Sequence, residues 1–209
     1  MILRFQSVLA LVWAAALPEL LAAQSTVRQD SIRFAAGTIV HLRNGANAVD
    51  LLGNGSRGSV IVGRRENYNA HGYSLATFYT LARVREGTPT LWHLIPLFAM
   101  TPVTDGVSTA EGADCILQDM RLVRLRRGGP VTLIVARRDV GETYASLAPV
   151  RFSVYELRRN DDGEAGWPLY RFELQGTIRA RRPYCDVNEA FARELGLGRD
   201  GLGEAEGGR

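Results

Sequence analysis

The feature that most constrains the fold is a repeated alternation of apolar and polar residues with a period of two. It is clearest over residues 170–179, where every second residue from Tyr170 to Ile178 is apolar or Gly. The residues between them are Arg, Glu, Gln or Thr. Because successive side chains of a strand point to opposite faces, this pattern predicts a half-buried β-strand.

Similar segments recur along the chain and are separated by turns rich in Gly, Asn, Asp and Pro. Pro96 indicates a bulge, an edge or a strand end within one of them. Seven or eight strands without helical repeats between them predict a mainly β protein, an antiparallel β-sandwich or a barrel-like domain. The other predicted strand segments are residues 32–42, 60–62, 73–84, 91–98, 116–125, 131–136 and 150–155.

One helix is predicted, over residues 186–195 near the C-terminus. Asp186 is a candidate N-cap, Glu189 follows three residues later, and Gly196 is a typical stop signal. From Gly196 to Arg209 the mixture of Gly, Arg, Asp and Glu predicts a disordered tail. The single β-rich domain therefore extends over residues 24–195.

The N-terminus has the pattern of a secretory signal peptide over residues 1–23. Arg4 precedes an apolar run, residues 7–17, that is too short to span a bilayer as a helix. Pro18 and Glu19 end the run, and small residues follow that suit cleavage after Ala22 or Ala23. We therefore expect a periplasmic or secreted protein without stable membrane insertion.

Export determines how the two cysteines are interpreted. Cys115 and Cys185 are the whole complement, and an even number in an oxidising compartment predicts one disulfide. Closing that loop would stabilise the fold by about 4 kcal/mol in the chain-entropy model. A reactive or zinc-binding thiol is the alternative, but no C-x-x-C motif and no neighbouring His supports it.

All 25 basic residues are Arg, and the net charge is +3. The absence of Lys excludes Schiff-base chemistry and other mechanisms that need a lysine amine. Most adjacent Arg pairs fall near strand ends, where solvated charge protects sheet edges. No nucleic-acid-binding motif accompanies them, so a nucleic-acid partner is not expected.

The richest polar segment is residues 64–71, which ends on His71 just before a strand. Asn67, Asn69 and His71 could form a ligand-binding loop, and His71 could also act as a general base. The alternative is a turn whose Asn side chains bond to their own backbone. His41 and His93 are the other histidines, and no ligand-pair spacing predicts a zinc site among the three.

Known catalytic motifs are missing. No G-x-S-x-G elbow occurs, and the glycines of residues 53–58 lack the βαβ context of a dinucleotide-binding loop. Residues 160–164 lack the closing Glu of a calcium loop. We therefore assign no catalytic residue, no metal and no cofactor.

Three segments resemble the periplasmic carbapenem intrinsic resistance proteins. They are residues 67–79, which begin Asn-Tyr-Asn-Ala-His, residues 112–124, which begin Gly-Ala-Asp-Cys, and residues 184–189, Tyr-Cys-Asp-Val-Asn-Glu. Residues 92–98 lie between the first two in the expected order. The resemblance implies a secreted, mostly β protein that protects its host without hydrolysing the antibiotic.

Two classes of function remain open. The first is an exported, non-enzymatic binding or protective protein, connected with carbapenem tolerance, whose candidate ligand-binding residues are Asn67, Asn69, His71, Tyr79 and Trp92. Its partner would be a small molecule or another periplasmic protein, and a homodimer is compatible with it. The second is a periplasmic hydrolase or metal-dependent enzyme that uses His71 with a carboxylate such as Asp114.

Overall fold

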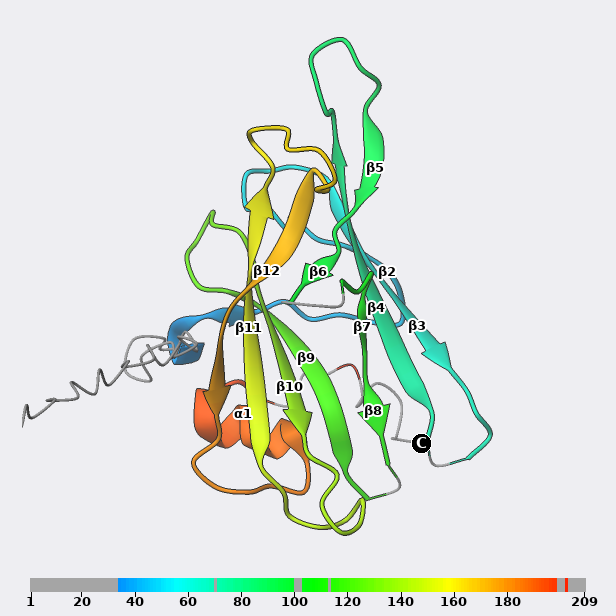
Figure 1. The fold of residues 1–209 in the computed structure, drawn as a ribbon, viewed down its shortest axis with the longest axis vertical. Coiled ribbons are helices and arrows are strands. Elements are labelled where there is room, and N and C mark those ends of the chain that lie inside the picture. Colours follow the sequence, from blue (N-terminus) through cyan, green and yellow to red (C-terminus); the bar gives the residue numbers. More distant parts are fainter. Residues whose placement is uncertain (1–33, 70, 100–102, 113, 199–201, 203–209) are drawn as a thin grey trace, which may run out of the picture.

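The computed structural model describes residues 34–69, 71–99, 103–112, 114–198 and 202, so the predicted signal peptide lies outside the described residues. The described residues begin with a short 3-10 helix, Phe34–Ala36, and then form twelve strands and one α-helix (Figure 1). The elements are β1 (Thr38–Ile39), β2 (Gly45–Ala48), β3 (Gly58–Arg65), β4 (Tyr73–Ala82), β5 (Leu91–Leu94), β6 (Leu97–Phe98), β7 (Val107–Ser108), β8 (Ala110–Glu111), β9 (Ile116–Arg124), β10 (Thr132–Arg138), β11 (Val150–Arg159), β12 (Tyr170–Arg179) and α1 (Val187–Leu195).

The strands form two separate sheets. The larger sheet has the order β1-β9-β10-β11-β12-β6, with β8 beside β9, and the smaller sheet has the order β2-β3-β4-β5, with β7 beside β4. All pairs are antiparallel except β12 with β6, which is parallel. The predicted class, mainly β with one C-terminal helix, is confirmed, and the architecture is the sandwich rather than the barrel.

The main core lies between the two sheets. Val60 and Phe78 of the smaller sheet pack toward Leu133 and Phe172 of the larger sheet, and all four are fully buried. The rings of Phe78 and Phe172 meet edge to face, with their centroids 5.1 Å apart. Within a strand the core side chains occupy every second position, as Val60 and Val62 of β3 do, which agrees with the period-two pattern.

A second core lies on the opposite face of the larger sheet, which α1 covers. Ile134 and Phe152 of the sheet pack with Phe191 of the helix, whose ring centroid is 5.3 Å from that of Phe152. Figure 1 shows α1 behind β10 and β11. The larger sheet is therefore buried on both faces, whereas the smaller sheet has one face that the described residues leave uncovered.

The helix begins and ends at the predicted residues. The Asp186 carboxylate accepts hydrogen bonds from the backbone N–H groups of Asn188, at 2.7 Å, and Ile116, at 3.2 Å. Gly196 adopts φ 68°, a left-handed conformation that Gly adopts without strain. The predicted disulfide between Cys115 and Cys185 is present, so the start of β9 and the start of α1 are joined covalently.

A buried ion pair holds the segment after α1 against the larger sheet. Arg121 and Asp119 of β9 are 3.2 Å apart, and both side chains are inaccessible to solvent. Arg121 also donates to Asn188 of the helix and to the carbonyl of Gly198, and the Asp119 carboxylate accepts from the N–H of Leu202. Burial raises the pKa of Asp119 above its ordinary value, although Arg121 opposes the shift.

This packing differs from the disordered tail that the sequence predicts from Gly196 onward. Leu197 is 1% exposed and Leu202 is 5% exposed, so the described residues of that segment contribute to the two cores. The sequence does not predict this burial, because two leucines in a Gly-rich, polar segment form no periodic pattern.

Two further differences concern single segments. Residues 91–98 form two strands rather than one, because the chain leaves the smaller sheet after Leu94 and enters the larger sheet at Leu97. Pro96 lies between these two strands. A strand end was one of the predictions made for Pro96. The second difference is Arg138, which belongs to an adjacent Arg pair interpreted as solvated charge but is only 2% exposed.

Candidate functional site

The predicted binding residues Asn67, Asn69 and His71 lie on the β3–β4 loop, where the Asn side chains stabilise the loop itself. Asn67 Nδ2 donates to the carbonyl of His71, at 2.7 Å, and the N–H of His71 donates to Asn69 Oδ1, at 2.9 Å. Tyr68 adopts φ 55° and its side chain is 95% exposed. The loop therefore has the turn geometry that was the alternative prediction, and Tyr68 and His71 project from it.

His71 lies against a second loop, residues 139–149 between β10 and β11. Its ring centroid is 5.5 Å from that of Tyr144. The buried guanidinium of Arg138 fixes this loop by donating to the carbonyls of Tyr144, at 2.7 Å, and of Ser146. Burial lowers the pKa of Arg138, and the nearby Asp186 opposes that shift. Two loops and the disulfide thus form one end of the molecule.

Tyr79 and Trp92 lie elsewhere, on the uncovered outer face of the smaller sheet. Tyr79 pairs with Leu94, and Trp92 pairs with Leu81, so all four side chains share this face. Along β4, Tyr79 lies about 20 Å from Tyr73, where the strand leaves the loop that holds His71, given about 3.3 Å per residue. The five predicted binding residues therefore do not line one pocket.

The outer face of the smaller sheet carries large apolar side chains that no described residue covers. Ile61 is 45% exposed, Leu75 43% and Trp92 49%. We call this surface the open face. Beside it lies a shallow hollow of about 460 Å³, lined by Trp92 and by residues of β2, β3 and the loop between them. The guanidinium of Arg57 lies 5.8 Å from the centroid of the Trp92 ring.

A cavity of about 520 Å³ lies between the β4–β5 hairpin and the β11–β12 loop. Asn160 holds that loop by donating to the carbonyls of Glu164 and Trp167. His93 lines the cavity, and among the described residues its buried Nε2 has no hydrogen-bond partner. His93 lies on β5 and is half-buried.

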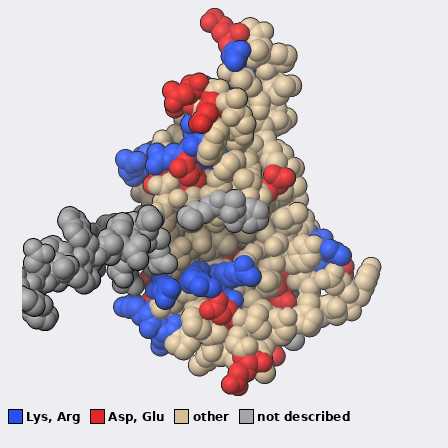
Figure 2. All heavy atoms as spheres, viewed as in Figure 1, with Lys and Arg blue, Asp and Glu red and all other residues tan. Residues whose placement is uncertain are grey.

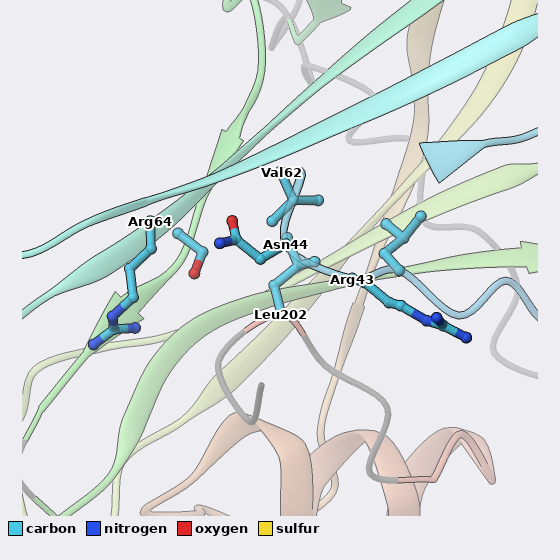
Figure 3. Close-up of a pocket in the computed structure, with 7 residues that line it drawn as sticks. Arg43, Asn44, Val62, Arg64 and Leu202 are labelled. Carbon is cyan, nitrogen blue, oxygen red and sulfur yellow. The ribbon is translucent and has the colours of Figure 1, made fainter. Parts of the chain in front are cut away.

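A third cavity, shown in Figure 3, is too small for a ligand. Its volume of about 20 Å³ has room for about one water molecule. Leu202 lies below Val62 and Asn44 in the figure, while the guanidinium groups of Arg43 and Arg64 point away on opposite sides. Leu202 thus fills the space at this edge of the sandwich.

The described residues contain no group of three or more His, Cys, Asp or Glu side chains arranged to hold a metal ion. His41 precedes β2, His71 lies on the β3–β4 loop and His93 lies on β5, so the three histidines do not converge. Of the helices in the described ranges, none is long and apolar enough to cross a bilayer.

Fold and surfaces together define a class: a two-sheet β-domain with a C-terminal helix, closed by a disulfide typical of exported proteins. Residues 42–193 match the family described as carbapenem resistance protein CarG-like. Because the match extends over more than half of the chain, the protein belongs to this family, as the resemblance of three sequence segments predicts.

A solved structure agrees with this assignment at the level of the fold. The crystal structure of CarG superposes with a TM-score of 0.61 at 24% sequence identity. The superposition covers 78% of this chain and 99% of the CarG chain. No curated protein matches the chain.

Proposed function

We propose that this member of the carbapenem resistance family is an exported, non-enzymatic protein that protects the cell from carbapenems by binding another periplasmic protein. The open face carries this proposal. Contiguous exposed apolar side chains on a folded domain mark interaction surfaces, and aromatic residues such as Trp and Tyr dominate the energetics of such surfaces. Family membership supports the connection with carbapenems.

Tyr79 and Trp92 are the proposed contact residues. Both lie on strands of a rigid sheet, which fixes their positions before a partner binds. Trp92 also lines the 460 Å³ hollow, which would accept a side chain of the partner. Asn67, Asn69 and His71 would form a secondary contact at the end of the β3–β4 hairpin, with the two Asn side chains shaping the loop.

The function is tested by expressing the full chain in a carbapenem-sensitive bacterium and measuring the minimal inhibitory concentration of a carbapenem. We expect resistance with the unmodified chain, and a clear loss of resistance with Trp92→Ala or Tyr79→Ala at equal periplasmic abundance. Trp167→Ala is the matched control, because it removes an exposed aromatic ring on the β11–β12 loop, outside both the open face and the β3–β4 loop. Equal loss for all three variants would contradict the assignment of the open face.

The hydrolase alternative is tested with purified protein. A binding protein leaves the ultraviolet absorbance of the carbapenem β-lactam ring unchanged over time. Turnover that disappears in His71→Ala while the fold is retained would replace our proposal with the enzyme. Sedimentation of the same sample would show whether the open face joins two copies of the chain instead of a different protein.

A further inference from the structure

A row of arginines crosses the larger sheet at the end nearest the disulfide. Arg137 of β10 pairs directly with Arg151 of β11, and Arg151 pairs directly with Arg179 of β12. Directly paired residues project from the same face, with Cβ atoms about 5 Å apart. Figure 2 shows the resulting basic band over the lower ends of these strands. We call these three residues the arginine row.

The arginine row is unfavourable for the isolated domain. Like charges at directly opposed positions of a sheet destabilise it. Asp139 pairs with Arg151, at 2.7 Å, and no described residue forms an ion pair with Arg137 or Arg179. Some exposed arginines elsewhere have their own carboxylates, such as Arg158 with Glu156. The row thus retains uncompensated positive charge.

The burial of side chains along β10 shows where the arginine row lies relative to the smaller sheet. On β10 the side chains of this face change from fully buried Leu133, through half-buried Val135, to exposed Arg137. Leu133 packs in the core between the sheets, so the row lies on the face that the smaller sheet partly covers. The row therefore lies at the foot of a step about 10 Å high, the usual spacing of packed sheets.

This position determines what kind of anion can reach the row. A flat anionic surface such as a membrane would contact the smaller sheet before it reached the arginines. A small monovalent anion carries one charge and would leave one of the two uncompensated arginines without a counter-charge. An extended polypeptide segment can lie along the step and present carboxylates at every second residue, about 6.7 Å apart.

The chemistry of the row fits carboxylates. A guanidinium offers a planar pair of donors that matches the two oxygens of a carboxylate. Exposed Thr177 and half-buried Ser153, which pair with each other on the same face, add hydroxyl groups next to the arginines. We propose that the arginine row binds an acidic extended segment of a partner protein, independently of the open face and of the resistance function proposed above.

The proposal is tested by fluorescence anisotropy with a labelled peptide in which Glu alternates with Ser, titrated with the full oxidised chain. We expect saturable binding that weakens as salt increases, and no binding of the matched Gln-Ser peptide. The double variant Arg137→Gln/Arg179→Gln should weaken binding at least about tenfold, since two charge-assisted contacts are lost. It keeps the Arg151–Asp139 pair, so folding is preserved and is checked by circular dichroism.

Arg127→Gln is the matched control, because Arg127 is an exposed arginine on the loop between β9 and β10, away from the row. An equal loss of affinity with Arg127→Gln would show attraction to net charge and would overturn the proposal. Failure of the Glu-Ser peptide to bind would overturn it as well. Binding to anionic phospholipid vesicles that depends on the row, without peptide binding, would replace the partner protein with a membrane.

Discussion

The two sheets of the sandwich differ in how they are enclosed. The larger sheet has a core on each face, one shared with the smaller sheet and one with α1. The smaller sheet contributes one face to a core and leaves Ile61, Leu75 and Trp92 exposed on the other. This difference indicates a division of roles, in which the larger sheet supplies stability and the smaller sheet presents a surface.

The largest effect is expected in the core between the sheets. Phe172→Ala should lower the free energy of unfolding by about 4 kcal/mol, because it removes a fully buried ring and leaves a cavity beside Phe78. Trp92→Ala on the open face should lower it by about 0.5 kcal/mol or less. Urea denaturation of the oxidised proteins measures both values. Similar losses for the two variants would remove the distinction between the sheets.

The next effect concerns the charged contact between the larger sheet and the segment after α1. Arg121→Met should cost about 3 kcal/mol, because it leaves the buried Asp119 carboxylate without its counter-charge. Adding Asp119→Asn should recover part of that loss, since the remaining polar group carries no charge. A double-mutant cycle by urea denaturation measures the coupling. Simple additivity of the two losses would show that the pair does not act as a unit.

A smaller effect tests how α1 is attached. Glu194 of the helix accepts hydrogen bonds from Tyr184, at 2.6 Å, and from Arg181, at 2.8 Å. Burial would raise the pKa of Glu194, but these two hydrogen bonds outweigh it, so the pKa is lowered. The carboxylate therefore contributes stability above its unfolded pKa of about 4.3, and that contribution is lost as the pH falls through the folded pKa.

Accordingly, Glu194→Gln should lower the free energy of unfolding by about 1 kcal/mol at pH 7. The difference from the unmodified protein should shrink as the pH falls below about 4. Thermal unfolding followed by circular dichroism across this range gives the comparison. A difference that is constant with pH would mean that the charge of Glu194 makes no contribution.

The smallest effect has the opposite sign. Arg179→Gln should raise the free energy of unfolding by about 0.3 kcal/mol, because it removes one like-charge pair from the arginine row. Careful chemical denaturation at low salt, where the repulsion is least screened, is the measurement. A decrease in the free energy of unfolding would mean that Arg179 makes a favourable contact and that the arginine row does not destabilise the fold.

Much of the fold is predictable from local pattern. The period-two segment 170–179 coincides with β12, and the helix start at Asp186 and stop at Gly196 are correct. Both signals depend on residues close together in the chain. The assignment of strands to sheets is not local, which explains why the transfer from β5 to β6 and the parallel pairing of β12 with β6 were not predicted.

The candidate site was less predictable for the same reason. Tyr79 and His71 are eight positions apart in sequence, yet they lie at different surfaces because β4 extends between them. Arg151 and Arg179 have no adjacent arginine in the sequence, so a search for adjacent Arg pairs does not find them. Only the register of β10, β11 and β12 aligns them with Arg137.

The disulfide has a further consequence for the intact protein. The segment from Cys115 to Cys185 contains β9, β10, β11 and β12 together with the exposed loops that connect them. A protease that cuts one of these loops leaves both pieces of the chain covalently joined. No fragment can leave the larger sheet until the bond is reduced, so a nicked molecule outside the cell's reducing compartment keeps its central sheet assembled.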